Sequence, residues 1–263
     1  MSEALKVPTM ADMMAAGKTP DVLFWVGSAG SFDDRAKKIS RAFVKILNKA
    51  DVNFAVLGTE ESSSGDAAKR AGNEFLFQIQ AITNIEVMNA YNVKKIVTCC
   101  PHSYNTIKNE YPELGGNYEV LHHTQFLQNL LKEGKITIDG DQYKGKKVTF
   151  HDPCYLGRAN SVFNAPRELM EKLEVNLVEM KRNKLNSLCC GAGGAQMFKE
   201  PENGSKDVNV LRTEDAMETS AEIIATGCPF CNTMMTDGVK AKEQEGKIEV
   251  LDIAELIANA GNL

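Results

Sequence analysis

The strongest constraint on the fold of this chain is that its second half repeats the plan of its first half. Four pairs of segments match: 26–30 with 151–155, 63–65 with 189–191, 100–103 with 228–231, and 118–121 with 248–251. The offset is 126 residues from Ser28 to Cys154 and 128 residues from Cys100 to Cys228, so it stays nearly constant. Such an offset across four separate segments indicates an internal duplication. The charged, glycine-containing stretch 139–147 predicts a boundary that divides the chain into lobes 1–145 and 146–263.

Apolar stretches alternate with amphipathic ones in both copies, an order that is typical of parallel sheets with helices on both faces. In the first copy we expect strands at 22–26, 54–57, 95–98 and 118–121, and helices at 33–48 and 66–91. In the second copy we expect strands at 147–150, 176–180 and 223–226, and helices at 165–173 and 208–221. The predicted fold is therefore α/β, with two pseudo-repeated lobes, each a parallel sheet flanked by helices.

Seven cysteines in a chain without a recognisable export signal predict metal ligands or redox groups rather than disulfides. Five of them lie in the second copy, where each is expected to follow the end of a strand: Cys154, Cys189, Cys190, Cys228 and Cys231. Iron in sulfide clusters prefers soft thiolate ligands, and glycines such as Gly191 let backbone N–H groups approach sulfur. A cubane cluster takes four cysteines, so five candidates with an adjacent pair indicate something else. A structural zinc site or a set of buried thiols is the alternative.

The segments Cys154, Cys189-Cys190-Gly191 and Cys228-Pro-Phe-Cys231 resemble the cysteine-rich CCG-domain family of heterodisulfide reductase. That family includes iron-sulfur subunits of glycolate oxidase, of lactate utilisation and of anaerobic glycerol-3-phosphate dehydrogenase. Its members carry two such domains in tandem, so the resemblance covers nearly the whole chain. It implies one noncubane four-iron, four-sulfide (4Fe-4S) cluster held by the five cysteines. Family members use such clusters to cleave disulfides at the cluster iron or to pass electrons between a flavoprotein and a quinone pool.

The first copy departs from the family pattern at four of its five ligand positions. These positions hold Ser28, Ser63, Ser64 and Ser103, and only Cys100, beside Cys99, remains. Serine is a hard oxygen ligand with a high pKa, so we expect lobe 1–145 to be a degenerate CCG-like lobe and lobe 146–263 to bind the cluster. We interpret Cys99 as a core residue and Cys100 as a vestigial ligand, with a reactive redox pair as the alternative.

A second departure concerns the source of electrons. The chain lacks the ferredoxin run C-x2-C-x2-C-x3-C-P that many relatives carry ahead of the duplicated domain. We therefore expect a partner redox subunit, either a flavoprotein or a ferredoxin-like iron-sulfur protein. A net charge of -5 disfavours nucleic-acid binding, which needs clustered basic residues. No leader pattern and no run of roughly 18 apolar residues occur, which predicts a cytoplasmic protein that associates with a membrane only through partner subunits.

Three functions follow as alternatives. The first is an iron-sulfur oxidoreductase subunit that transfers electrons between a partner redox subunit and a quinone or disulfide acceptor. The second is a thiol-disulfide reductase of the heterodisulfide type, with its substrate bound at the cluster. The third is a zinc-binding structural subunit of a redox complex. The pattern assigns no catalytic residue.

Four histidines and one arginine are further candidates. The histidines could be ligands or proton donors, although structural roles are the more common use of such residues: His102, His122, His123 and His151. His151 lies three residues before Cys154, within reach of a hydrogen bond to the cluster or substrate. Arg158 and the Asp152-Pro153 turn could hold the cluster loop or an anionic substrate, or could form a surface ion pair.

Overall fold

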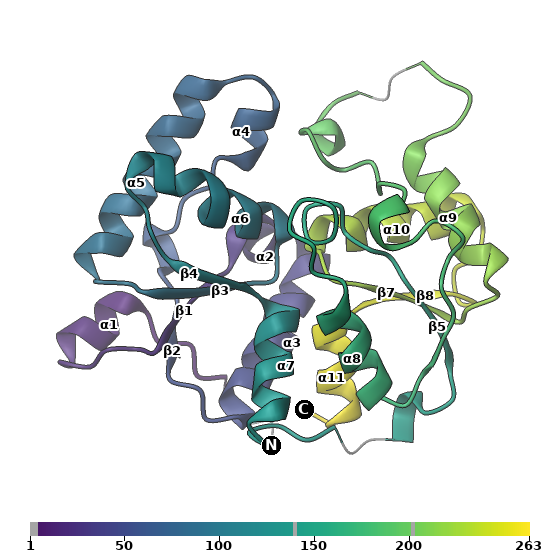
Figure 1. Ribbon diagram of the computed structural model, residues 1–263, viewed down its shortest axis with the longest axis horizontal. Helices are drawn as coiled ribbons and strands as arrows, with labels where there is room; N and C mark the ends of the chain where they lie inside the picture. The colour runs from purple at the N-terminus through teal and green to yellow at the C-terminus, as the bar shows by residue number, and fades with distance from the viewer. Residues whose placement is uncertain (1–4, 139–140, 201–202) are drawn as a thin grey trace.

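The computed structural model describes residues 5–138, 141–200 and 203–263 (Figure 1). Residues 1–4, on which the expectation of no leader partly rests, lie outside these ranges, as do the first two residues of the predicted linker 139–147. The described chain forms two lobes side by side, each built on one sheet. Within those ranges, no helix has both the length and the apolar character that crossing a membrane requires.

The two sheets have the same strand order. The first, β2-β1-β3-β4, consists of β1 (Val22–Trp25), β2 (Phe54–Ala55), β3 (Lys95–Thr98) and β4 (Glu119–His122). The second, β6-β5-β7-β8, consists of β5 (Lys147–Phe150), β6 (Asn176–Leu177), β7 (Ile223–Thr226) and β8 (Glu249–Asp252). All the pairings between these strands are parallel. The predicted α/β fold with two pseudo-repeated lobes is therefore confirmed.

Helices cover the sheets, and the first lobe contains α1 (Met10–Ala15), α2 (Gly27–Phe32), α3 (Asp34–Lys49), α4 (Asp66–Arg70), α5 (Glu74–Ala90), α6 (Pro101–Asn105) and α7 (His123–Lys132). The second lobe contains α8 (Asn164–Lys172), α9 (Val208–Glu218), α10 (Pro229–Ala241) and α11 (Ile253–Ala260). Short 3-10 turns occupy Gly58–Glu60, Tyr111–Leu114, Asp141–Tyr143, Lys184–Asn186 and Gln196–Phe198, and a π-helical turn spans Thr106–Glu110.

Several predicted boundaries differ from the structure. The single helix predicted at 66–91 is wrong, because residues 71–73 divide it into α4 and α5. Gly72 has a φ of +86°, a left-handed conformation that interrupts the helix, and the Asn73 side chain caps α5 by accepting from the Leu76 N–H at 3.0 Å. The strands predicted at 54–57 and 176–180 are two residues long. Strands β3, β5 and β7 match their predicted bounds. Strands β1, β2 and β6 and helix α9 begin where they were predicted, and the other ends shift by one to three residues.

Both faces of each sheet are buried, as a parallel sheet requires. In β1, Leu23 packs in a cluster with α5, whereas Phe24 packs against Phe43 of α3, with 5.1 Å between ring centroids. In β7, Ile224 packs with Ala216 of α9, whereas Ile223 and Ala225 belong to the cluster that both lobes share. Each sheet therefore contributes one face to its own lobe and one to the contact between the lobes.

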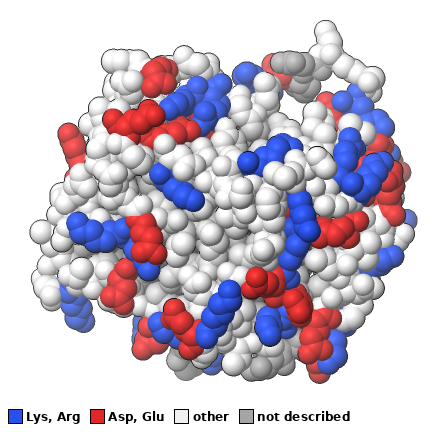
Figure 2. Space-filling model, in the orientation of Figure 1, with Lys and Arg blue, Asp and Glu red and all other residues white. Residues whose placement is uncertain are grey.

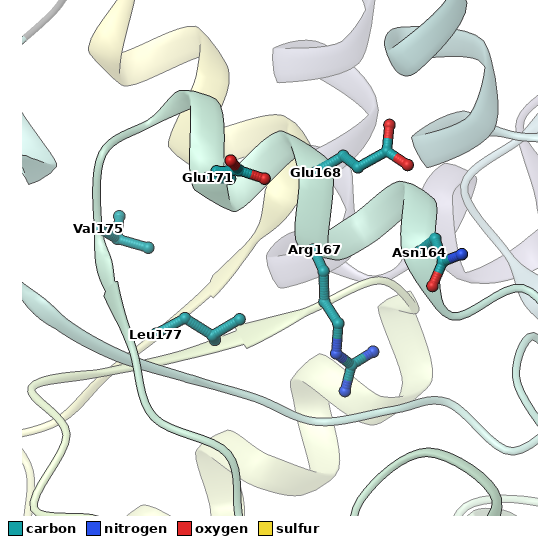
Figure 3. Close-up of a pocket in the computed structure, with 6 residues that line it drawn as sticks. All are labelled: Asn164, Arg167, Glu168, Glu171, Val175 and Leu177. Atoms are coloured by element: carbon teal, nitrogen blue, oxygen red, sulfur yellow. The ribbon is translucent and has the colours of Figure 1, made fainter.

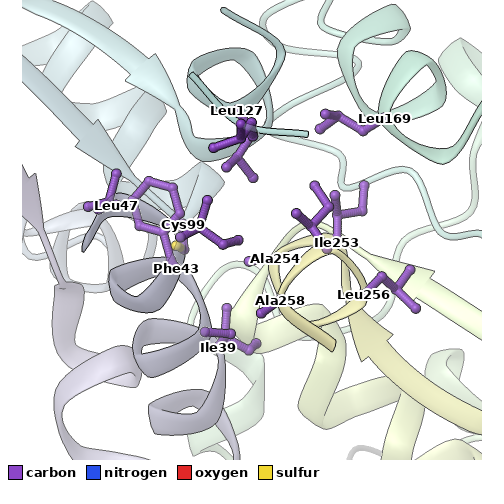
Figure 4. Packing of buried hydrophobic residues seen from close by; sticks show 14 of the residues in the cluster. Ile39, Phe43, Leu47, Cys99, Leu127, Leu169, Ile253, Ala254, Leu256 and Ala258 are labelled. Carbon is purple, nitrogen blue, oxygen red and sulfur yellow. The ribbon is translucent and has the colours of Figure 1, made fainter. Parts of the chain in front are cut away.

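One hydrophobic core runs through the contact between the lobes (Figure 4). Helices α3 and α7 of the first lobe stand there beside α8 and α11 of the second (Figure 1). The first lobe contributes Ile39, Phe43, Leu47, Cys99 and Leu127, and the second contributes Leu169, Ile253, Ala254, Leu256 and Ala258. At this contact each lobe buries apolar surface of the other, so the stability of each lobe depends on the other.

Polar contacts reinforce this junction. Arg35 of α3 donates to both carboxylate oxygens of Glu255 in α11 at 2.7 Å. At the centre, His123 Nε2 lies 2.9 Å from an oxygen of Asp252, and His122 Nε2 lies 3.0 Å from the carbonyl oxygen of Gly227. Burial, and then the neighbouring His123, lower the pKa of His122, so its neutral ring donates to that carbonyl. Both histidines are fully buried and take part in hydrogen bonds within the junction.

Candidate metal centre

The five cysteines of the second lobe converge at the carboxyl end of its sheet. Cys154 follows β5 after a short turn, Cys228 follows β7 as the N-cap of α10, and Cys231 lies in the first turn of that helix. The prediction that each cysteine follows a strand is wrong for Cys189 and Cys190. They lie in the long connection between β6 and α9, after the 3-10 turn at Lys184–Asn186, because β6 ends at Leu177.

The sulfur atoms of these cysteines form one connected group of free thiols. Cys190 Sγ lies 3.3 Å from Cys231 Sγ. Cys189 is hydrogen-bonded to both Cys154 and Cys190, and Cys228 is hydrogen-bonded to Cys231. Three of the five are at most 3% exposed, whereas Cys154 and Cys189 reach the surface in part. The loop and the helix therefore bring all five predicted residues together.

These contacts favour negative charge on two of the thiols. Hydrogen bonds from Cys154 and then from Cys190 lower the pKa of Cys189 far below that of a free thiol. Burial opposes charge on Cys228, but hydrogen bonds from Cys100 and Cys231 outweigh it and hold the pKa of Cys228 well below its usual range. The site therefore offers thiolates, which are the form of cysteine that binds metals.

A glycine shapes the loop around the first thiolate. The backbone N–H of Gly191 donates to Cys189 Sγ at 3.3 Å, and Gly191 has a φ of +92°, in the left-handed region. A Cβ there would lie 3.4 Å from Val208 Cβ and 3.5 Å from Met234 Cε. Glycine therefore lets the backbone approach the sulfur while the loop packs against α9 and α10.

A sixth thiol reaches the site from the first lobe. Cys100 is the N-cap of α6, as Cys228 is of α10, and the two side chains are hydrogen-bonded to each other. This bond, followed by burial, raises the pKa of Cys100, so Cys100 is the donor. Cys99 points the other way, into the shared core (Figure 4). The alignment of the copies pairs Cys100 with Cys228, but no local pattern indicates that the two meet.

Hydroxyl groups stand at the other matching positions of the first lobe. Ser103 Oγ and Ser64 Oγ lie 3.4 Å apart. Val26 and Gly27 belong to the segment that matches the Cys154 loop of the second lobe. Their backbone N–H groups donate to the carboxylate of Glu61 at 2.9 and 2.6 Å. Burial raises the pKa of Glu61 to about 7. The first lobe therefore replaces thiols with its own network of oxygen atoms.

His102 also faces the site from the first lobe. Its Nδ1 lies 2.9 Å from Asp66 Oδ2, and its ring packs against Tyr155 and Phe230, with centroid distances of 4.7 and 5.4 Å. Burial lowers the pKa of His102, but the bond to Asp66 and the charge on Cys228 outweigh it and raise the pKa. His102 is therefore a protonatable group beside the cysteine loops.

His151 lies beneath the thiols in the second lobe. Its Nδ1 accepts from Nε of the fully buried Arg212 at 3.0 Å, and its Nε2 is buried without a hydrogen-bond partner among the described residues. A ligand atom of His151 and the sulfurs of Cys190 and Cys231 all lie within 4.8 Å of one another. Burial, and then the charge of Arg212, lower the pKa of His151 to about 3. No local pattern marks Arg212 as buried, since it lies mid-helix among polar residues.

The carboxylate of Asp152 is paired with Arg167 and not with Arg158, the arginine considered from the sequence. Asp152 accepts two hydrogen bonds from Arg167 at 2.9 Å and one from the Lys184 N–H at 2.8 Å. Arg158 instead donates to the carbonyl oxygen of Ser187. Both contacts tie the Cys154 loop to the segment that leads to Cys189.

Two concave regions of the described chain lie apart from the cysteines. One, of about 370 Å³, is lined by residues of α8, of β6 and of the link between them (Figure 3): Asn164, Arg167, Glu168, Glu171, Val175 and Leu177. The other, of about 450 Å³, lies where α3 and α11 end near residues 134–137. The face shown in Figure 2 carries acidic and basic side chains side by side, with a largely uncharged centre.

Comparison with known proteins gives two matches to one family model. The model, described as the cysteine-rich domain CCG, matches residues 22–108 and 148–236. Each range covers most of one sheet, and each includes the positions of the cysteines or of the matching serines.

Three curated relatives show the same similarity along most of the chain. The probable iron-sulfur-binding oxidoreductase FadF of Bacillus subtilis is 48% identical over 97% of this chain and 36% of its own length. The EtfAB:quinone oxidoreductase of Syntrophomonas wolfei is 45% identical over 93% of this chain and 35% of its own length. One subunit of the dihydromethanophenazine:CoB–CoM heterodisulfide reductase of Methanosarcina barkeri is 35% identical over 91% of this chain and 59% of its own length. The chain therefore spans only part of each relative.

Proposed function

This chain belongs to the cysteine-rich CCG domain family, and on that premise we propose that it is the cluster-binding part of an iron-sulfur oxidoreductase. The proposed ligands of one noncubane 4Fe-4S cluster are Cys154, Cys189, Cys190, Cys228 and Cys231. Lobe 146–263 holds these ligands. Lobe 1–145, a degenerate CCG-like lobe, binds no cluster and closes the site with Cys100 and His102. Electrons pass between a partner redox subunit and a quinone or disulfide acceptor.

The observation that carries this proposal is the convergence of five thiols, two of them with lowered pKa, around one loop and one helix start. This donor set fits an iron-sulfur cluster, because soft thiolates bind its iron and backbone N–H groups such as that of Gly191 stabilise its sulfur. Such a cluster, when bound, accepts and releases single electrons. The protein's own part is to hold the thiolates, to exclude water from Cys190 and Cys231, and to bring the first lobe against the site.

A quinone is the favoured acceptor. The relative named as a quinone oxidoreductase is 45% identical to this chain, whereas the relative named as a heterodisulfide reductase subunit is 35% identical. Reduction of a quinone to a quinol takes two electrons and two protons, so the cluster would act twice for each quinol. The partner redox subunit, a flavoprotein or a ferredoxin-like protein, would supply the electrons.

Disulfide reduction is the second candidate, and the partial exposure of Cys154 and Cys189 supports it. A substrate sulfur could approach the cluster on that side. Two electrons and two protons would convert the disulfide into two thiols. Mixing the reduced protein anaerobically with a water-soluble quinone or with a small disulfide, and following the absorbance of the cluster, distinguishes the two. Oxidation by the quinone alone supports the first candidate, and oxidation by the disulfide supports the second.

Metal analysis tests the proposed cluster itself. The protein is purified without oxygen, iron, sulfide and zinc are measured, and electron paramagnetic resonance is recorded in the oxidised and reduced states. Cys189→Ser is the test variant. Cys99→Ala is the matched control, because Cys99 is a buried cysteine that points away from the site.

We expect four irons and four sulfides per chain in the wild type and in Cys99→Ala, and a large loss in Cys189→Ser. Zinc without sulfide would overturn the proposal in favour of a structural zinc site. Equal iron loss in both variants would mean that Cys189 contributes no more to cluster binding than a cysteine outside the site, and it would contradict the assignment of Cys189 as a ligand.

A further inference from the structure

We infer that His151 is not a metal ligand but donates a hydrogen bond from Nε2 to the sulfur atoms of the site, and that this bond raises the reduction potential of the cluster. The inference rests on the proposed function. It makes His151 a positioning and tuning residue, and it assigns to Arg212 the task of fixing the tautomer of His151.

Arg212 determines which nitrogen of His151 carries the proton. Its side chain is completely buried and donates to four groups: His151 Nδ1 at 3.0 Å, the carbonyl oxygen of Arg182 at 2.7 Å, Asp215 at 3.2 Å and Ser187 Oγ at 3.4 Å. A guanidinium group has no acceptor. His151 Nδ1 must therefore be the acceptor in this contact, and the single proton of the neutral ring lies on Nε2.

The Nε2 atom of His151 is buried and has no hydrogen-bond partner among the described residues. A buried N–H without an acceptor is rare in folded proteins and calls for a physical reason. The sulfurs of Cys190 and Cys231 supply one, because together with a ligand atom of His151 they form a group in which every distance is within 4.8 Å. Thiolate and sulfide atoms at this position would accept the proton of Nε2.

The hydrogen bonding of His151 excludes the alternative that it binds a metal with Cys190 and Cys231. A histidine that ligates through Nε2 must carry its proton on Nδ1, and it usually donates that proton to a carboxylate or carbonyl oxygen. Here Nδ1 accepts a hydrogen bond from Arg212, so Nδ1 carries no proton. His151 therefore lacks the Nδ1–H group that a histidine bound to a metal through Nε2 would have. The geometry of the group resembles a metal triad, but its hydrogen bonding supports a donor.

An N–H donor at this position changes the redox equilibrium of the cluster. Reduction adds negative charge to the cluster, and an N–H dipole that points at sulfur stabilises the reduced state more than the oxidised state. Removal of the donor should therefore shift the potential to more negative values. We expect the one-electron reduction equilibrium to weaken by about tenfold, which corresponds to about 59 mV.

The experiment compares two substitutions of similar size. His151→Met removes the donor, and His151→Gln retains an amide N–H near the position of Nε2. Iron content is measured first for the wild type and both variants, and the midpoint potential is then determined by titration monitored with electron paramagnetic resonance. We expect a more negative potential in His151→Met and a potential near that of the wild type in His151→Gln. Unchanged potentials in both iron-loaded variants, or equal shifts in both, would overturn the inference.

A second measurement does not depend on the cluster. Nitrogen-15 resonances of labelled histidine in the iron-free wild-type protein report which ring nitrogen of His151 carries the proton, with His151→Gln used for assignment. Protonation of Nε2 supports the inference, and protonation of Nδ1 overturns it. Absence of iron from the wild-type protein would overturn the proposed function instead, while this measurement would still decide the tautomer.

Discussion

The thiol of Cys100 interacts with that of Cys228 and helps to hold the pKa of Cys228 low, although the two residues lie in different lobes and occupy equivalent positions of the repeat. Both are N-caps of helices that follow the third strand of their sheet, so the contact places the ends of both sheets at one site. This interaction stabilises the thiolate of Cys228, one of the five proposed ligands.

Replacing Cys100 tests this role. We expect Cys100→Ala to retain iron but to have a more negative reduction potential, because a hydrogen bond to a charged group is worth about 1.5–3 kcal/mol. Cys100→Ser keeps an O–H donor and should remain closer to the wild type. The measurement is the midpoint potential after iron content has been checked, with Cys99→Ala as control. A Cys100→Ala protein without iron would instead identify Cys100 as a ligand.

The shared core predicts that the lobes unfold together. Leu256 is completely buried in the second lobe, and its replacement by alanine should cost about 2–5 kcal/mol. Trp25, the single tryptophan of the chain, lies in the first lobe and reports that lobe by fluorescence. In urea, Leu256→Ala should lower the midpoint seen by Trp25 and by circular dichroism equally. Leu185→Ala, at a side chain that is 60% exposed, is the control that should change neither. Separate transitions would contradict the prediction.

Glu61 predicts a pH dependence of stability. Its pKa of about 7 in the folded state exceeds the ordinary value of 4.5, so the folded protein retains a proton that the unfolded chain loses between these values. The corresponding stability is fully present below pH 4.5 and is lost as the pH rises through about 7, by at most about 3 kcal/mol. We would measure the free energy of unfolding in urea from pH 5 to pH 8 for the wild type and for Glu61→Gln. This decrease in the free energy of unfolding with rising pH, called the slope, should occur in the wild type and be absent from Glu61→Gln. The control, Glu60→Gln, should keep the slope, and an unchanged slope in Glu61→Gln would refute the assignment.

The pair of Asp152 and Arg167 predicts a coupling between an ion pair and the cysteine loop. Asp152 is 2% exposed, so Arg167→Met would leave a buried charge without its partner at a cost of about 3–5 kcal/mol. Because Asp152 also binds the segment that leads to Cys189, we expect iron content to fall as well. Adding Asp152→Asn should restore much of the stability. Lys144→Met, which breaks an exposed pair with Glu174, should change neither the urea midpoint nor the iron content.

The repeat made the sheets predictable. Strands β5 and β7 have the predicted bounds because both are short runs rich in β-branched residues, which end before His151 and before Gly227. The break at Gly72 was missed because a single glycine within a helical pattern is ambiguous until its φ is known. The convergence of Cys154 and Cys228 follows from the parallel sheet. The contact of Cys100 with Cys228, and the buried position of Arg212 under His151, depend on how two lobes and a helix pack, which no local pattern records.

The continuous core between α3, α7, α8 and α11 also has a consequence for the covalent connection of the lobes. Gly145 lies in the link between them, and its N–H donates to the carbonyl oxygen of Glu174. A protease that cut the backbone beside Gly145 would sever the polypeptide without separating its parts. The two fragments should migrate as one particle in size-exclusion chromatography and part only in denaturant, as the two chains of an obligate heterodimer do.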